Sequence, residues 1–312
     1  MTCNEMLKPQ DSLMANGKSF YWASKFLGAQ MGDNAARLYA FCRLLDDMAD
    51  GDIPDGPARL ARIHADLIQN KSSTDPAFAS FQSFMRDMNF SKNVLTALID
   101  GLLQDSANNV CLVSEKELVI YAYRVAGTVG LLMCEVLNCA NENAKAYAID
   151  LGIGMQLTNI ARDVLEDATM GRRYIPGEWL NNLSPDEIRF AATEPEGEAA
   201  QEVRASIKRL LALAETYYKS GASGYRFLPW RAHLSIALAA RIYRQIGLQL
   251  ADRGFPWHEG RQVTSKAVKL RCSLIAPGSL VTRLLSYDRT HDQLLHAHLQ
   301  DLPYVKHKQN TF

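Results

Sequence analysis

Three oxygen-bearing side chains recur at every fourth position near the middle of the chain: Asn159, Asp163 and Asp167. On an α-helix, residues four apart lie on one face, so these side chains would form a stripe more than about 10 Å long. Apolar residues between them give the same helix a hydrophobic side. That side predicts a helix packed within a bundle, where an acidic stripe is harder to explain as solvated surface.

A second acidic group lies earlier in the chain, in the segment FCRLLDDMADG. Asp46 and Asp50 are also four residues apart, whereas Asp47 is offset from their face. Like charges at this spacing repel by about 0.2–0.5 kcal/mol unless a cation lies between them. The alternative is a solvated helix end, because Gly51 and Pro54 follow directly.

Together the two groups predict metal-dependent chemistry on a diphosphate. Mg²⁺ prefers octahedral oxygen ligands and usually binds through one or two carboxylates together with substrate phosphates. Two facing helices that each carry acidic side chains can hold such ions in a bundle, where the ions would stabilise a departing diphosphate. Four arginines near the acidic groups are expected to donate hydrogen bonds to the same phosphate oxygens: Arg43, Arg162, Arg172 and Arg173.

The segment Tyr121–Leu137 contains Gly127 and Gly130 within an otherwise helical and apolar pattern. Each glycine costs a helix about 1 kcal/mol relative to alanine, which a close approach by a neighbour would offset. The neighbour is either another helix or an extended ligand. The apolar residues of the segment either line a tunnel for a hydrocarbon tail or fill the core.

Long helices must position these side chains. The chain has no proline between Pro76 and Pro176, and proline breaks helix interiors. Apolar residues recur at spacings of three and four, whereas alternating strand patterns are not evident. We therefore predict an all-α, single-domain helical bundle over residues 16–290, with an N-terminal segment over 1–15 and a C-terminal tail over 291–312.

Composition excludes some functions. The 312 residues include 34 Lys+Arg and 34 Asp+Glu, and the resulting net charge of 0 argues against a nucleic-acid partner. Six cysteines without metal-ligand spacing, and an N-terminus without an apolar core, predict reduced thiols in a cytoplasmic protein. The longest strongly apolar stretch, Val125–Leu137, is shorter than the ~20 residues that span a bilayer.

The C-terminal region carries basic residues and histidines. Arg261, Lys266 and Lys269 either close over the diphosphates or are solvated, as basic side chains usually are. The histidines lack zinc-ligand spacing and are expected at the surface: His291, His296, His298 and His307.

Three segments resemble the signatures of the squalene/phytoene synthase family, the head-to-head prenyl transferases. They are YAFCRLLDDMAD (39–50), YAYRVAGTVG (121–130) and QLTNIARDVLED (156–167), the last followed by RRYIP (172–176). The segments GKSFYWASKFL (17–27) and AARIYRQIG (239–247) extend the resemblance to about residue 270. The first of these, with GEWL (177–180), is most similar to the bacterial, phytoene-forming branch.

The resemblance implies an isoprenoid-synthase fold with a central cavity lined by Mg²⁺, or alternatively Mn²⁺. The implied metal ligands are Asp46, Asp50, Asn159, Asp163 and Asp167, and the four aspartates would act in catalysis with Tyr39 and Arg43. The resemblance also implies contacts with prenyl diphosphate from Ser19, Phe20, Tyr39, Arg43, Tyr121, Gln156, Arg162, Arg173 and Tyr243.

The implied reaction joins two prenyl diphosphates through a cyclopropyl diphosphate. With geranylgeranyl diphosphate the product is 15-cis-phytoene, made without NADPH for carotenoid biosynthesis; with farnesyl diphosphate it is squalene or presqualene diphosphate. A further alternative is an inactive family member that acts as an assembly factor, which the intact aspartates disfavour. Amphiphilic substrates and an oily product predict peripheral contact with the inner face of the membrane.

Overall fold

The computed structural model describes residues 8–107, 109–261, 264–283 and 290–305, without the side chains of residues 266 and 282. These residues form helices and turns, and within them the only β-type pairing is an isolated bridge between Cys111 and Arg173. The predicted all-α fold is therefore confirmed. The α-helices are α1 (Pro9–Asn16), α2 (Lys18–Ser24), α3 (Ala29–Ala49), α4 (Gly56–Ile68), α5 (Pro76–Asp87), α6 (Lys92–Asp105), α7 (Glu115–Ala122), α8 (Thr128–Val136), α9 (Ala144–Thr169), α10 (Pro185–Ala191), α11 (Glu198–Ser223), α12 (Trp230–Asp252) and α13 (Lys266–Ile275).

Shorter helical segments connect several of these elements. A π-helical segment, η1 (Tyr123–Gly127), joins α7 to α8 into one continuous helix. The remaining short segments are 3₁₀ turns: η2 (Gly177–Trp179), η3 (Gly224–Phe227), η4 (Trp257–Glu259), η5 (Ala276–Arg283) and η6 (Gln293–His296).

Local sequence explains where several helices begin. Ser184 and Glu187 form the capping box that starts α10, with the serine side chain and the glutamate carboxylate each accepting from the other residue's backbone N–H. Asp75 caps α5 by accepting from two backbone N–H groups, and Pro76 occupies the first helical position, where its missing N–H costs nothing.

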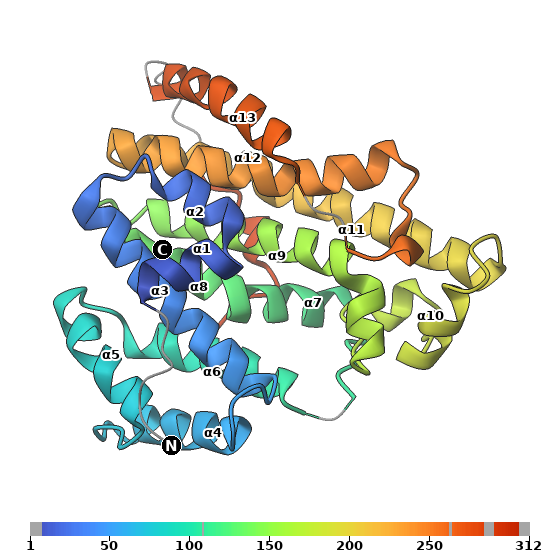
Figure 1. The fold of residues 1–312 in the computed structure, drawn as a ribbon, viewed down its shortest axis with the longest axis horizontal. Coiled ribbons are helices and arrows are strands. Elements are labelled where there is room, and N and C mark those ends of the chain that lie inside the picture. Colours follow the sequence, from blue (N-terminus) through green and yellow to red (C-terminus); the bar gives the residue numbers. More distant parts are fainter. Residues whose placement is uncertain (1–7, 108, 262–263, 284–289, 306–312) are drawn as a thin grey trace, which may run out of the picture.

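Helix α9 lies at the centre of the bundle, with α8 on one side and α11 and α12 on the other (Figure 1). Two glycines allow its close crossing with η1 and α8. A Cβ on Gly130 would lie 2.3 Å from the Ala148 carbonyl oxygen, and one on Gly152 would lie 2.3 Å from that of Ala126. The close approach predicted for Gly130 is therefore made by a neighbouring helix, although both glycines also border the cavity described below.

The continuous helix Glu115–Val136 is apolar over a longer range than the sequence analysis considered. Its 22 residues have a mean hydropathy of 1.4, so by length and composition alone it could cross a membrane. The most apolar window is 56% buried, however, and the helix packs between α6 and α9. Its position is that of a core helix, and its apolar residues line the central cavity.

The C-terminal segment 290–305, which covers the described part of the tail predicted over 291–312, lies against the bundle. Leu299 is fully buried, and the Tyr123 hydroxyl donates to the Pro303 carbonyl oxygen at 2.6 Å. The surface position expected for the histidines is wrong for His291 and His296, which hydrogen-bond the fully buried Asp150 on α9. His298 is exposed, as expected, and His307 lies outside the described residues.

Candidate active site

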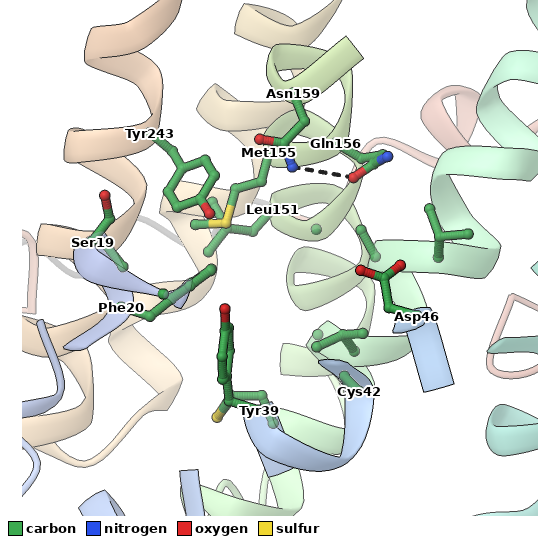
Figure 2. Close-up of a pocket in the computed structure, with 18 of the residues that line it drawn as sticks. Ser19, Phe20, Tyr39, Cys42, Asp46, Leu151, Met155, Gln156, Asn159 and Tyr243 are labelled. Atoms are coloured by element: carbon green, nitrogen blue, oxygen red, sulfur yellow. Dashed lines mark hydrogen bonds between the residues drawn. The ribbon is translucent and has the colours of Figure 1, made fainter. Parts of the chain in front are cut away.

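The bundle encloses a cavity of about 860 Å³ between α2, α3, α6, α8, α9, α12 and α13. It follows α9 from Asp167 to Ala144, almost the whole 26-residue helix, which is about 39 Å long. Carboxylates and arginines gather at the Asp167 end, whereas apolar side chains such as Met133 and Leu151 line the other half. Figure 2 shows Asp46, Gln156 and Asn159 facing this space from opposite sides.

Helix α3 contributes Asp46 and Asp50, both of which line the cavity. The Arg43 guanidinium lies 3.0 Å from Asp46, and Arg172 lies 2.8 Å from Asp50. Burial raises the pKa of Asp46 to about 6, because the opposing effect of Arg43 is offset by the negative charges of Asp50 and Asp105. Asp46 therefore faces the cavity, in which its side chain remains 46% exposed.

Helix α9 presents Asn159, Asp163 and Asp167 to the same cavity, as their spacing predicts. Arg162 donates to Asp163 at 2.7 Å, whereas the Asp167 carboxylate has no ion pair among the described residues. Burial raises the pKa of Asp167 to about 8, and the charges of Asp163 and Glu166 add to the rise. The charged form of this carboxyl is therefore disfavoured unless a cation compensates it.

Asp105, at the end of α6, is a cavity residue that the sequence analysis missed. Its carboxylate accepts from the Tyr121 hydroxyl at 2.8 Å and the Tyr174 hydroxyl at 2.7 Å. Burial raises its pKa to about 6 despite these hydrogen bonds and the nearby Arg172. No acidic residue at helical spacing accompanies Asp105, so no sequence pattern marks it. Tyr121, predicted to contact substrate, lines the cavity and orients this carboxylate.

The donor set fits a hard divalent cation. The ligands that face one another are oxygens, which Mg²⁺ prefers. The Asn159 side-chain oxygen is buried without a hydrogen-bond partner, while its NH₂ group donates to Gln156 at 3.3 Å. A buried acceptor without a donor, beside carboxyls whose pKa values are raised, indicates a place for positive charge.

Basic side chains border the same end of the cavity. Arg261 lies 3.5 Å from Asp163 and 3.7 Å from Glu166, and it is half exposed. Lys269 is buried and borders the cavity, where burial and the neighbouring Lys18 lower its pKa. Both Arg261 and Lys269 border the cavity, Arg261 with half of its side chain exposed and Lys269 buried. The Lys266 side chain lies outside the described residues.

Arg173 is the one predicted substrate contact that does not border the cavity. Its guanidinium donates to the backbone carbonyls of Leu183 at 2.9 Å and Leu112 at 3.1 Å, and the residue is buried. The segment after α9 is extended, so neighbouring side chains point to opposite sides. Arg172 therefore faces the aspartates, whereas Arg173 connects two loops.

The other predicted contacts line the cavity: Ser19, Phe20, Tyr39, Arg43, Gln156, Arg162 and Tyr243. Three of them form an aromatic group beside the carboxylates, with ring centroids 5.0 Å apart for Phe20–Tyr243 and 6.2 Å apart for Phe20–Tyr39 (Figure 2). Burial raises the pKa of Tyr39 to about 12, so its phenol stays protonated. Aromatic faces attract cations, which suits a site where positive charge develops.

This fold is shared with solved prenyl-synthase structures. A dehydrosqualene synthase bound to a ligand superposes with a TM-score of 0.76 at 26% identity, covering 88% of this chain and 95% of that one. A squalene synthase from Alicyclobacillus acidocaldarius gives a TM-score of 0.66 at 21% identity, covering 79% and 93%. The class is therefore the isoprenoid synthases with an all-α fold.

The chain belongs to the squalene/phytoene synthase family, whose model matches residues 13–269. Members are prenyltransferases that need a divalent metal to bind prenyl diphosphates. A phytoene synthase of Pseudescherichia vulneris is 35% identical over 86% of this chain and 90% of its own length. A 15-cis-phytoene synthase of a Paracoccus species is also 35% identical, over 85% and 88%. A presqualene diphosphate synthase of Rhodopseudomonas palustris is 29% identical, over 82% and 92%.

Proposed function

We propose that this protein is a 15-cis-phytoene synthase, which condenses two geranylgeranyl diphosphates head to head with Mg²⁺ and without NADPH. The observation that carries the proposal is one cavity that joins carboxylates and arginines at one end to a long apolar channel along α9. The two phytoene synthases at 35% identity support the choice of product. Bound Mg²⁺ would supply positive charge to the diphosphate oxygens, and the residues that would hold it are Asp46, Asp50, Asn159, Asp163 and Asp167.

The two ends of the cavity bind different parts of the substrates. Arg43, Arg172 and Arg261 donate hydrogen bonds to the diphosphates and hold both leaving groups at one end. The apolar walls align the two hydrocarbon chains along α9 and exclude water, which would otherwise capture the allylic cation. Phe20, Tyr39 and Tyr243 lie between the two ends, where their rings stabilise that cation.

The atoms balance over two steps. One donor loses diphosphate, and the double bond of the second donor attacks the resulting cation; loss of a proton then closes the cyclopropane ring. The cyclopropyl diphosphate ionises in turn, rearranges and loses a second proton to give phytoene, so two diphosphates and two protons are released. Burial raises the pKa of Tyr39 to about 12, so its phenol stays protonated at neutral pH and can donate a hydrogen bond.

The test is the product formed by the purified chain. Geranylgeranyl diphosphate with Mg²⁺ and no NADPH should give a hydrocarbon with the chromatographic retention and mass of 15-cis-phytoene. Turnover of farnesyl diphosphate alone, to presqualene diphosphate or squalene, would contradict the proposal and favour the alternative. No turnover of either substrate would favour the assembly factor.

A further inference from the structure

Helix α13 and the turn η5 carry an exposed apolar surface on the outside of the bundle. Leu270 and Leu274, one helical turn apart, are 55% and 76% exposed, and Ile275 and Val281 are 43% and 54% exposed. These four residues are called the outer α13 face. Single exposed apolar residues are ordinary, whereas a contiguous group of large ones marks a docking surface.

The outer α13 face is not needed to hold the helix in place. Val268, Cys272 and Ala276 recur at every fourth position and pack against α2 and α12. The Trp22 indole N–H also donates to the Ser273 hydroxyl at 2.8 Å. The inner side of α13 is thus fully engaged. Figure 1 shows the helix at the periphery, with α12 between it and most of the bundle.

Two exposed basic side chains accompany this face. The stretch from residue 261 to 283 has five basic residues and no acidic one, but Arg261 pairs with Asp163 and Glu166, and Lys269 is buried beside the cavity. Arg271 and Lys25 are exposed, and the Lys25 ammonium lies 5.4 Å from the centroid of the Trp22 ring. Apolar residues flanked by Lys and Arg match a bilayer that contains anionic lipid, since the headgroups attract the cations and the interface accepts the leucines.

The same helix borders the active-site cavity. Lys269 lines the cavity one position before Leu270, and Phe20 both lines the cavity and packs against the inner side of α13. The outer α13 face and the cavity are therefore separated by the thickness of one helix. We propose that the outer α13 face docks the protein onto an anionic lipid bilayer beside the cavity. Docking there would let an amphiphilic substrate enter, and an apolar product leave, without crossing bulk water.

Transfer of substrate and product rests on the proposed function, whereas docking itself does not, so the two are measured separately. The docking test is co-sedimentation of the purified full chain with vesicles of phosphatidylcholine alone or with added phosphatidylglycerol. We expect binding that is strong with the anionic vesicles and weakens as salt is raised. The Leu270→Ser/Leu274→Ser variant should bind at least about tenfold more weakly, because two apolar side chains no longer enter the interface.

A matched control removes two equally exposed apolar residues elsewhere. Ile68 on α4 and Phe190 on α10 are 58% and 65% exposed, and the Ile68→Ser/Phe190→Ser variant should bind vesicles like the wild type. The Arg271→Gln variant should bind anionic vesicles about fivefold more weakly than the wild type, and its binding to neutral vesicles should be unchanged.

Three outcomes would overturn the docking proposal. The first is that the wild type fails to sediment with anionic vesicles, and the second is that the two double variants bind vesicles equally. The third is a dimer, found by light scattering, that becomes a monomer in the Leu270→Ser/Leu274→Ser variant without a change in vesicle binding. The last result would assign the face to a second copy of the chain. Turnover of detergent-dispersed substrate should be the same in both double variants, so a failed docking test leaves the proposed reaction measurable.

Discussion

Asp150 and Asp167 lie on the same helix, α9, the first fully buried and the second partly buried, and their surroundings act on the carboxyl in opposite ways. Asp150 accepts from Ser220 at 2.5 Å and is bonded to His291 at 2.7 Å and His296 at 2.8 Å. Burial alone would raise its pKa, but the two histidines outweigh burial and hold the pKa below its usual value. The side chains of Ser220, His291 and His296 thus stabilise the charge of Asp150 without an external ligand.

Among the described residues, no side chain forms an ion pair with Asp167. Burial and two neighbouring acids raise its pKa to about 8, and Asp46 and Asp105 follow the same direction with pKa values of about 6. A carboxyl whose charge is disfavoured in the isolated protein is a place where an external cation lowers the free energy. Asp150 is therefore a structural residue, whereas we propose that the cavity carboxylates bind a ligand.

The largest expected effect is on catalysis at the cavity. Asp163→Asn or Asp46→Asn should lower kcat/KM by at least about 10³, equal to about 4 kcal/mol, because each would remove a charge that we propose holds the metal. Circular dichroism should show an unchanged helix content. Asp47→Asn is the control on α3, since Asp47 pairs with Arg43 but does not line the cavity, and it should lose less than about tenfold. Near-normal turnover in either main variant would contradict the metal assignment.

The next effect is on stability at Asp150. Asp150→Asn should lower the free energy of unfolding by about 3 kcal/mol, because two buried histidines lose the carboxylate to which they are bonded. Urea unfolding at pH 7 measures the loss, and turnover per folded molecule should change only a few fold. His296→Gln should cost less, since Asp150 keeps His291. An unchanged unfolding midpoint in Asp150→Asn would remove the contrast between the two sites.

Metal affinity should depend on pH. Protons compete with the cation for carboxylates whose pKa values are about 8 for Asp167 and about 6 for Asp46 and Asp105. The dissociation constant for Mg²⁺ should therefore fall as pH rises from 6 to 8, by about tenfold per pH unit for each proton displaced. Calorimetric titration at several pH values measures it. A constant that does not change with pH would show that these carboxyls are already ionised without metal.

The smallest effect concerns the stability of the metal-free protein. Because the folded pKa of Asp167 is raised, the carboxyl costs nothing below its ordinary pKa of 3.8, and stability is lost as pH rises from there through about 8. Asp167→Asn should therefore raise the free energy of unfolding in EDTA by about 0.5–2 kcal/mol at pH 8, and by less at pH 5. The pH dependence of stability has the opposite sign for Asp150, because its lowered pKa means that its stabilising effect is lost only as the pH falls. A destabilised Asp167→Asn protein at pH 8 would refute this.

Local periodicity accounts for what could be predicted. The spacing of Asn159, Asp163 and Asp167 predicted both a helix and the side that faces the cavity, because helical geometry fixes which residues share a face. The same argument worked for Asp46 and Asp50. Helical periodicity does not reveal Asp105, because the Tyr174 hydroxyl that donates to its carboxylate lies 69 positions away in the sequence. No local pattern encodes such a pair.

The histidines of the C-terminal segment show the same limit of local sequence patterns. The histidines lack zinc-ligand spacing, and for that reason the sequence predicts that they lie at the surface. The partner of His291 and His296 is a carboxylate that lies 141 and 146 positions away on α9. Burial of these histidines depends on where the chain returns to the bundle, which residue types alone do not determine.

We propose that the cavity carboxylates bind a cation and diphosphate, whereas Asp150 only stabilises the fold. The rise in Tm on adding Mg²⁺ with inorganic pyrophosphate to wild type, Asp163→Asn and Asp150→Asn tests this difference. We predict a clear rise for the wild type, the same increment from a lower starting Tm for Asp150→Asn, and none for Asp163→Asn. An increment that survives in Asp163→Asn, or vanishes in Asp150→Asn, would contradict the account.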